Sequence, residues 1–454
     1  MPRNLLDTES FFGGLQRMVQ TTGVVRGVFA RVAGKKMGIF TENAEYAADL
    51  KSVLGGLKGP LMKAAQFLAM IPGVLPEEYA KELAQLQSNA PPMGWNFVRR
   101  RMTAELGLEW EKYFHSFGHR ASAAASLGQV HRAILKDGRV VACKLQYPNM
   151  DTAVETDLRQ FRIAISVYHK IDNAIQQDDV VEELAERLRE ELDYRRESAN
   201  MRLYRIMLDA CPDITVPEPI DSLITQRLLI MQWVDGTTFN TDLCDRLTEA
   251  QRKHIARALF RSWYIPLYRY GIIHGDPHMG NFTLRDDGGL NLLDFGVIRI
   301  FPPSFVKGNV DLYNALCTKD SEKAAEAYKA WGFRDLTYEK VAVLNEWAGL
   351  LFSPLMEDCE RYIQSDEMIT QGRAHLKRVH ESLQKVGGVR LPREFVLVDR
   401  SAIGLGSVFT RLKVKMNWYR LFHEVIEDFD QQALSQRQKN ALKVANFPNT
   451  ELYS

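Results

Sequence analysis

The chain has 454 residues, 46% of them hydrophobic and 25% charged, which is typical of a folded protein with one large or two ordinary domains. The formal net charge of +1 gives no electrostatic reason to expect nucleic acid as a partner. Five scattered cysteines without a C-x-x-C pair argue against a disulfide framework or zinc site, and no apolar run is long enough to predict a transmembrane helix.

Residues 1–40 form a basic segment in which six Lys or Arg face two acids, Asp7 and Glu9. The valines between these charges allow a basic amphipathic helix that lies on a membrane or a partner. An ordinary solvated helix is the competing interpretation, and Gly23 and Gly27 favour it because glycine weakens helices. The first residues carry acids and lack the apolar region of a signal peptide.

Residues 41–117 are predicted to form a helical extension. Pro60 opens a helix in which Lys63 and Gln66 lie three positions apart and therefore share one face. A second helix is expected after Pro76 and a third over residues 95–108.

Residues 118–236 are predicted to form a mixed lobe. Strands are expected at residues 131–135 and 140–145, joined by a turn at Asp137-Gly138, and a helical pattern covers residues 151–207. Two short strands are expected at residues 220–224 and 227–234. Residues 237–454 then read as a helical lobe, with an apolar helix at 250–270 and almost only helices from 304 onward.

A phosphate-binding pattern lies at the start of the mixed lobe. The glycine-rich loop of kinases, G-x-G-x-x-G-x-V, has its counterpart in Ala123-x-Ala125-x-x-Gly128-x-Val130, with Ala124 and Ser126 between. By itself this stretch would be interpreted as an alanine-rich linker. Lys144 follows in Val-Ala-Cys-Lys, which matches the kinase strand whose lysine contacts the α- and β-phosphates.

The run from His274 to Asn281, with Asp294 in Leu-Leu-Asp-Phe-Gly, has the order of a kinase catalytic loop and metal-binding turn. Asp276 takes the position of the catalytic aspartate. Asn281 and Asp294 offer the oxygen ligands that Mg²⁺ prefers, whereas His278 suits loop packing or a place beside phosphate better. His274 is expected to brace the loop.

Other parts of a nucleotide site are less specific. The strand that ends near Asp235 predicts a hinge, with adenine against the backbone of Gln232 and Val234 and with Met231 at the back of the pocket; plain core is the alternative. Acidic partners for Lys144 lie between residues 191 and 197. On one helix Asp193 and Glu197 share a face, and Glu191 points elsewhere.

Together these motifs resemble the UbiB/AarF (ABC1-type) atypical kinase-like family, which includes the mitochondrial coenzyme Q kinases. The resemblance covers residues 55–300 and implies an α+β, bilobal protein-kinase-like fold with an N-terminal helical extension and a mostly helical C-lobe. It implies that Glu197 pairs with the strand lysine. It also implies that Lys63 and Gln66 lie on a lid whose lysine engages Glu191 and Asp193.

The sequence departs from the family in two places. The glycine of the lid motif is Ala65, and one methyl group in a tightly packed helix is enough to shift the lid. The two C-terminal transmembrane helices of typical bacterial members have no counterpart, which places the chain nearer a soluble or peripheral branch.

The function that the resemblance implies is Mg²⁺-dependent ATP hydrolysis that supports ubiquinone biosynthesis. The expected ligands are ATP and Mg²⁺, the expected partners are quinone-biosynthesis enzymes and a membrane surface, and the expected location is cytoplasmic or peripheral on the inner membrane. No peptide-docking segment follows Asp294, which argues against protein phosphorylation. The alternatives are a small-molecule or lipid kinase, and a nucleotide-gated scaffold without turnover. Gly404-x-Gly406 is assigned no function.

Overall fold

The computed structural model describes residues 92–155 except 126, residues 188–364, 381–390 and 395–448, and a few isolated positions between these ranges. The predicted basic segment and the helix with Lys63 and Gln66 lie outside the described residues.

An antiparallel sheet forms the smaller lobe, in the order β1-β3-β4-β7 with β2 paired to β3. Its strands are β1 (Phe114–Phe117), β2 (Ala123–Ala125), β3 (Gly128–Leu135), β4 (Val140–Gln146) and β7 (Leu228–Gln232). The predicted strands at 131–135 and 140–145 are confirmed, and the predicted turn joins them.

The two faces of this sheet bury different sets of side chains, because successive residues of a strand point to opposite sides. Cys143 and Leu145 of β4 pack in one apolar cluster with α5 (Trp95–Leu106). Ala142, on the other face, belongs to the larger cluster that contains α8 (Tyr194–Met207). The second face is therefore the one turned toward α8 and the helical lobe.

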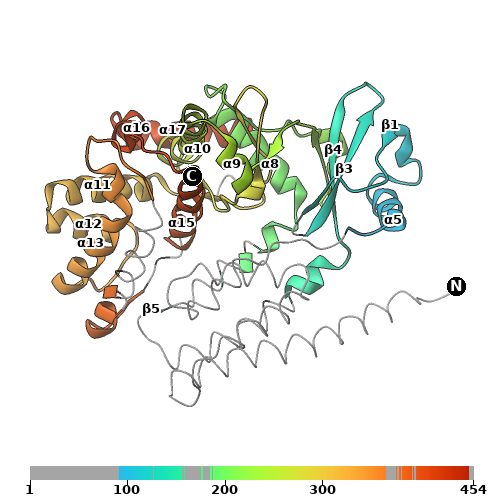
Figure 1. Cartoon of the computed structure of the whole chain (residues 1–454). Coiled ribbons are helices and arrows are strands. Elements are labelled where there is room, and N and C mark those ends of the chain that lie inside the picture. Colours follow the sequence, from blue (N-terminus) through green and yellow to red (C-terminus); the bar gives the residue numbers. More distant parts are fainter. Residues whose placement is uncertain are drawn as a thin grey trace, which may run out of the picture.

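The helix α8 lies between the sheet and the helical lobe (Figure 1). Asp193 caps its N-terminus, since the Asp193 carboxylate accepts a hydrogen bond of 3.0 Å from the backbone N–H of Arg195. Tyr194, Met201 and Tyr204 are almost fully buried, so the helix is fixed on both the sheet side and the lobe side.

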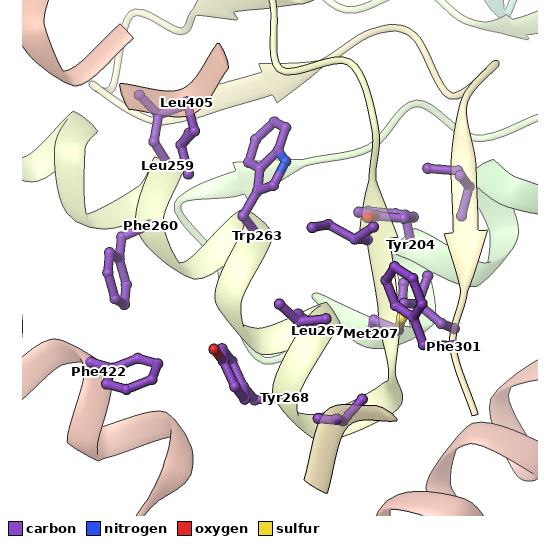
Figure 2. Close-up of a cluster of buried hydrophobic side chains, with 14 of the residues drawn as sticks. Tyr204, Met207, Leu259, Phe260, Trp263, Leu267, Tyr268, Phe301, Leu405 and Phe422 are labelled. Atoms are coloured by element: carbon purple, nitrogen blue, oxygen red, sulfur yellow. The ribbon is translucent and has the colours of Figure 1, made fainter. Parts of the chain in front are cut away.

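The helical lobe is built around α10 (Glu249–Tyr270), which confirms the apolar helix predicted at 250–270. Thr248 and Gln251 form a capping box at its start, in which each side chain bonds to the backbone of the other residue. Figure 2 shows how the aromatic side chains of α10 pack against the neighbouring elements. The labelled residues of α10 are Leu259, Phe260, Trp263, Leu267 and Tyr268, and their labelled neighbours are Tyr204, Met207, Phe301, Leu405 and Phe422.

Short strands hold the loop that follows α10. β9 (Ile272–His274) pairs antiparallel with β12 (Ile298–Ile300), and β10 (Phe282–Leu284) pairs antiparallel with β11 (Leu290–Leu292). β6 (Ile214–Thr215) and β8 (Thr237–Thr238) extend the second pair. The loop from Gly275 to Asn281 and the turn around Asp294 therefore start and end at paired strands.

The remaining helices fill the lobe at the opposite side of Figure 1 from β3 and β4. They are α9 (Thr241–Arg246), α11 (Pro303–Thr318), α12 (Ser321–Ala330), α13 (Tyr338–Phe352), α15 (Phe395–Leu412), α16 (Trp418–Ile426) and α17 (Gln431–Val444). The prediction of an almost wholly helical C-terminal region is confirmed for its described part. The short strand β13 (Val389–Arg390) and the bridge between Arg361 and Met416 are exceptions.

The bilobal α+β fold is thus as predicted, with local differences. The strand predicted at residues 220–224 is wrong: Asp221–Leu223 is a 3-10 helix, and only Pro219 makes a bridge, to Met231. The strand β1 was not predicted. Although both precede residue 118, α5 packs on the sheet of the smaller lobe and β1 is one of the strands of this sheet. The domain boundaries themselves stay predictions.

In the described part of the chain, no helix combines the length and the apolar character needed to cross a bilayer.

Candidate functional site

Lys144 and Glu197 form a buried ion pair between the sheet and α8. The Nζ atom of Lys144 lies 2.7 Å and 2.9 Å from the two carboxylate oxygens of Glu197. It also lies 3.5 Å from Oδ2 of Asp294. Lys144 is 8% exposed and Glu197 is 3% exposed, so solvent hardly screens the pair. The two residues that the resemblance pairs are therefore in direct contact.

The charge of Lys144 is maintained by these carboxylates. Burial would lower the pKa of Lys144, but Asp294 and Glu197 outweigh burial and raise the pKa above that of an ordinary lysine. The ammonium group is consequently charged at neutral pH and is held in one orientation by three carboxylate oxygens. A fixed positive charge at this position suits a phosphate chain.

A side chain of α8 fixes the turn at Asp294 by a hydrogen bond. Asn200 donates its side-chain N–H to the carbonyl oxygen of Phe295 at 2.7 Å, and the Phe295 ring is fully buried against Tyr204. Oδ1 of Asp294 accepts a hydrogen bond of 2.9 Å from the backbone N–H of Gly296. The Asp294 side chain keeps 30% of its surface exposed, so this carboxylate remains accessible to a ligand.

His274 joins the catalytic loop to this turn. Its Nε2 lies 2.5 Å from the carbonyl oxygen of Asp294, and its Nδ1 lies 3.1 Å from the backbone nitrogen of Asp276. The backbone N–H of Asp276 can only donate, so Nδ1 carries no proton and Nε2–H donates to the carbonyl of Asp294. The indole N–H of Trp263 donates a hydrogen bond of 2.9 Å to the backbone carbonyl of His274. These contacts agree with the bracing role predicted for His274.

Asn281 closes the same loop. Its side-chain nitrogen donates to the backbone carbonyl of Asp276 at 2.9 Å. The backbone carbonyl of Asn281 accepts a hydrogen bond of 3.0 Å from the backbone N–H of Leu293. With the amide nitrogen engaged, the amide oxygen is the atom of Asn281 suited to a cation. Asn281 is thus hydrogen-bonded directly to Asp276, and His274 links Asp276 to Asp294.

No cluster of three or more His, Cys, Asp or Glu suited to a metal occurs in the described ranges. Asn281 and Asp294 supply one amide oxygen and one carboxylate, which is fewer ligands than a metal cage needs. They fit a Mg²⁺ ion, since this ion is usually bound by one or two carboxylates and completed by substrate phosphates and water.

The alanine-rich stretch forms one strand of a hairpin. Ala123 pairs with Val130 and Ala125 pairs with Gly128, while Ser126 lies outside the described residues. A Cβ atom on Gly128 would lie 2.3 Å from the carbonyl oxygen of Leu145, so glycine is required there. The alanines are therefore part of a paired strand next to a position that only glycine can occupy.

At the predicted hinge, one of the backbone groups is already engaged. The N–H of Gln232 donates to the carbonyl of Glu218 at 2.7 Å, so this donor is not available to adenine. Met231 is 6% exposed and stands opposite Ala142 in the sheet, on the face that carries Lys144. Val234 follows β7 and is half-buried.

The acidic residues before α8 differ from their predicted arrangement. The helix begins at Tyr194, so helical periodicity does not extend back to Glu191 and Asp193. Asp193 caps the helix, whereas Glu191 is buried, with its Cγ 3.4 Å from where a Cβ on Gly296 would stand. The expectation that Glu191 points elsewhere is wrong, because Glu191 lies beside the Asp294 turn.

The remaining predicted residues separate into two groups. His278 is exposed, and its Nδ1 accepts from the backbone N–H of Gly280 at 3.0 Å, in line with a loop-packing role. Contacts between the lid residues Lys63 and Gln66 and the acids before α8 fall outside the described residues.

Sequence reasoning missed two residues that border the site. Tyr194 is 1% exposed, and its ring lies under Lys144, with Nζ 5.2 Å from the ring centroid. Gly404 of α15 approaches Pro277, the residue after Asp276, so closely that a Cβ on it would lie 2.8 Å from Cγ of Pro277. A tyrosine directly after the acidic motif was visible in the sequence, whereas nothing local marks the contact of Gly404.

Comparisons with known proteins agree with this geometry. The profile of the ABC1 atypical kinase-like domain matches residues 85–328. An uncharacterized aarF domain-containing protein kinase of Arabidopsis thaliana chloroplasts is 31% identical over 299 residues, 65% of this chain and 42% of the relative. The mitochondrial atypical kinase coq-8 of Caenorhabditis elegans is 25% identical over 428 residues, 92% of this chain and 54% of the relative. The chain thus spans about half the length of these curated relatives.

A solved structure is also similar. The complex of Rv3197 with erythromycin from Mycobacterium tuberculosis has a TM-score of 0.57 and 27% sequence identity, covering 84% of this chain and 96% of that chain. Kinase-like domains bind ATP together with a divalent metal ion. The profile match covers more than half of the sequence, and the chain belongs to the ABC1 atypical kinase-like family.

Proposed function

We propose that this protein binds ATP with Mg²⁺ and hydrolyses it slowly, and that this activity supports ubiquinone biosynthesis. The observation that carries the proposal is the position of Lys144, whose ammonium group is fixed between Glu197 and Asp294. A kinase-like site uses the same lysine to hold the phosphate chain next to the metal-binding aspartate.

Each residue has a separate task in this reaction. Lys144 binds the α- and β-phosphates, and Glu197 keeps its ammonium group in place. Asn281 and Asp294 would hold Mg²⁺, which when bound neutralises charge on the phosphate oxygens. Asp276 would orient the attacking water, and its loop is positioned by its backbone bond to His274. Catalysis then depends on positioning and electrostatics.

The short connection after Asp294 favours water as the acceptor over a peptide. β12 ends at Ile300 and α11 begins at Pro303, so the chain passes from the Asp294 turn into the helical lobe within nine residues. A protein kinase places an activation segment here to dock its substrate. The lid with Lys63 and Gln66 is proposed to restrict access further.

The test for turnover is phosphate release from ATP by the full chain, with Lys144→Ala as the inactive variant. Lys136→Ala is the matched control, because Lys136 is an exposed lysine in the connection between β3 and β4, the strand that carries Lys144. Turnover should require Mg²⁺ and Lys144 but not Lys136. Equal phosphate release by the wild type and Lys144→Ala would contradict the proposal.

The role in ubiquinone biosynthesis rests on the family resemblance and needs its own test. Quinones should be profiled in a strain that lacks the gene and is complemented with the wild type, Lys144→Ala or Asp276→Asn. Loss of quinone in both variants supports a role for turnover. Full rescue by an Asp276→Asn variant that still binds ATP favours a nucleotide-gated scaffold.

A second candidate is a kinase that acts on a small molecule or lipid. The similar structure, in which Rv3197 is in complex with erythromycin, supports small-molecule binding at this fold. Transfer of ³²P from ATP to an alcohol group, measured against phosphate release in the same samples, decides between the two. Transfer that exceeds hydrolysis would reverse the order of the candidates.

Peripheral membrane attachment through residues 1–40 is a further part of the proposal, based on their six basic residues. Co-sedimentation with anionic liposomes should fall when this segment is removed. Unchanged co-sedimentation would rule out the segment as the anchor.

A further inference from the structure

Tyr194 is buried at the centre of the candidate site but was not part of its predicted machinery. It is the first residue of α8 and is 1% exposed. Its hydroxyl group has no hydrogen-bond partner among the residues that the structure describes. The Nζ atom of Lys144 lies 5.2 Å from the centre of its ring.

The register of the sheet shows on which side this hydroxyl lies. Val130 stands directly opposite Lys144 in the β3–β4 pair, and opposed residues of an antiparallel pair present their side chains on one face. Gly128 is two residues before Val130 and faces the same way. A Cβ on Gly128 would lie 3.0 Å from the hydroxyl of Tyr194. The hydroxyl therefore lies beneath the alanine-rich hairpin, on the face that carries Lys144.

A hydroxyl without a partner in this position calls for an explanation, because a buried polar group that lacks a hydrogen bond is unfavourable. Phenylalanine would fill the same volume without that cost. Burial raises the pKa of Tyr194, with Lys144 opposing the shift, so the hydroxyl keeps its proton at neutral pH. It is a donor that lies beside Gly128 of the hairpin, on the sheet face that carries the Lys144 ammonium group, and a phosphate oxygen bound there would complete its bonding.

We propose that Tyr194 is a nucleotide-binding residue whose hydroxyl donates a hydrogen bond to a phosphate oxygen next to Lys144. The proposal rests on the proposed ATP site and adds a residue to it. The hairpin has alanines where other kinases have glycines, and the hydroxyl supplies a phosphate contact from α8, beneath the hairpin.

The test compares Tyr194→Phe with the wild type for binding of ATP and of adenosine, which has no phosphate. ATP should bind about tenfold more weakly to the variant, since a hydrogen bond to a charged group is lost, and adenosine binding should not change. Tyr328→Phe is the matched control. Tyr328 of α12 is also fully buried with an unpartnered hydroxyl, but lies in the helical lobe far from β3 and β4 (Figure 1).

Thermal unfolding separates the binding role from a packing role. Without nucleotide, Tyr194→Phe should unfold at the same or a higher temperature than the wild type, because the unpaired hydroxyl is gone. With ATP, its stabilisation should be smaller than that of the wild type, whereas Tyr328→Phe should keep the full ATP-induced shift.

The possible outcomes are distinct. If the wild type binds ATP and Tyr194→Phe binds it equally well or more tightly, the inference is overturned and the ATP site stands. If the variant loses ATP and adenosine to the same extent, the tyrosine acts by packing and the inference is also overturned. If the wild type binds no ATP, the proposed function fails, and the inference about Tyr194 fails with it.

Discussion

Lys144 in the sheet and Glu197 in α8 are 53 positions apart in sequence, yet both oxygens of the glutamate lie within 2.9 Å of the lysine Nζ. Because both side chains are buried, neither can recover its hydration when the other is removed. The contact fixes the position of α8 against the sheet, and through Asn200 it also fixes the turn at Asp294.

The first prediction concerns the energetics of this pair. Lys144→Met or Glu197→Gln alone should lower the free energy of unfolding by about 3–5 kcal/mol, because each removes one charge of a buried ion pair. The double variant should lose much less than the sum of the two. Urea unfolding of the four proteins gives the coupling energy. Additive losses would mean that the contact contributes no coupling.

The second prediction concerns Gly404, to which the sequence assigned no role. Gly404→Ala places a methyl group 2.8 Å from Cγ of Pro277 and should displace the residue next to Asp276. Overpacking of this kind costs about 1–3 kcal/mol. The maximal rate of ATP hydrolysis should fall, while ATP binds nearly as well, because Lys144 is not touched.

Gly349→Ala is the control for Gly404→Ala. Gly349 lies in α13, and nothing lies within 4 Å of the position that its Cβ would take. Alanine should therefore stabilise this helix by roughly 0.5–1 kcal/mol and leave hydrolysis unchanged. The interpretation of Gly404 is wrong if both variants hydrolyse ATP at the rate of the wild type.

The third prediction concerns the residues that follow α17, which pack behind α8. Nε of Arg202 donates to the carbonyl of Ala445 at 2.9 Å, and the guanidinium of Arg196 lies 5.5 Å from the ring centre of Phe447. Gln438, in the middle of α17, donates hydrogen bonds from its side-chain nitrogen to the carbonyls of Tyr270 and Phe301 in the helical lobe. The helix α17 thus links that lobe to the helix that carries Glu197.

Removal of this link should loosen α8. Phe447→Ala should cost about 3–5 kcal/mol, since the ring is 5% exposed, and should weaken ATP binding through Glu197. Lys439→Ala, an exposed change on α17, should alter neither quantity. Equilibrium unfolding and ATP titration measure the two effects. If Phe447→Ala loses stability but binds ATP normally, α17 does not support α8.

The fourth prediction concerns pH. His131 is fully buried, with its Nδ1 2.7 Å from the carbonyl of Gly118 and its Nε2 2.8 Å from the side-chain nitrogen of Gln129. Burial lowers its pKa, the bond to Gly118 opposes this, and the neighbouring His119 lowers the pKa further. The unfolded chain therefore binds a proton more readily than the folded one, and His131 destabilises the fold as pH falls below about 6.5.

The measurement is the free energy of unfolding between pH 5 and pH 8 for the wild type, His131→Gln and His115→Gln. The wild type and the control, whose His115 is exposed, should lose stability more steeply toward low pH than His131→Gln. Three parallel pH profiles would show that His131 is not the titrating group.

Local spacing was sufficient to predict which loop residues of the candidate site lie close together. Asp276, Asn281 and Asp294 lie on short loops between paired strands, so their separation in sequence determines their separation in space. The strand with Lys144 followed from its β-branched residues and the turn before it. The pairing with Glu197 came from the family resemblance, since several carboxylates nearby were equally suitable.

The parts that could not be predicted depend on contacts between distant segments. Gly404 is 127 positions from Pro277, and Tyr194 meets Gly128 only because α8 starts beside the hairpin. Glu191 was misplaced because the start of α8 decides which periodicity applies to it. The short segment Ile-Asp-Ser-Leu-Ile at 220–224 has too little periodicity to distinguish a strand from a 3-10 helix, and here the chain makes one bridge, at Pro219, before the 3-10 helix begins.

The central claim, a metal-dependent ATP site at Asp294, is tested most directly by the affinity for ATP with and without Mg²⁺. The proteins are the wild type, Asp294→Asn and Asp287→Asn; Asp287 is an exposed aspartate nearby that pairs with Arg285. We expect Mg²⁺ to strengthen ATP binding in the wild type and in Asp287→Asn but not in Asp294→Asn. An Asp294→Asn variant that keeps the full Mg²⁺ effect and hydrolyses ATP normally would contradict the account.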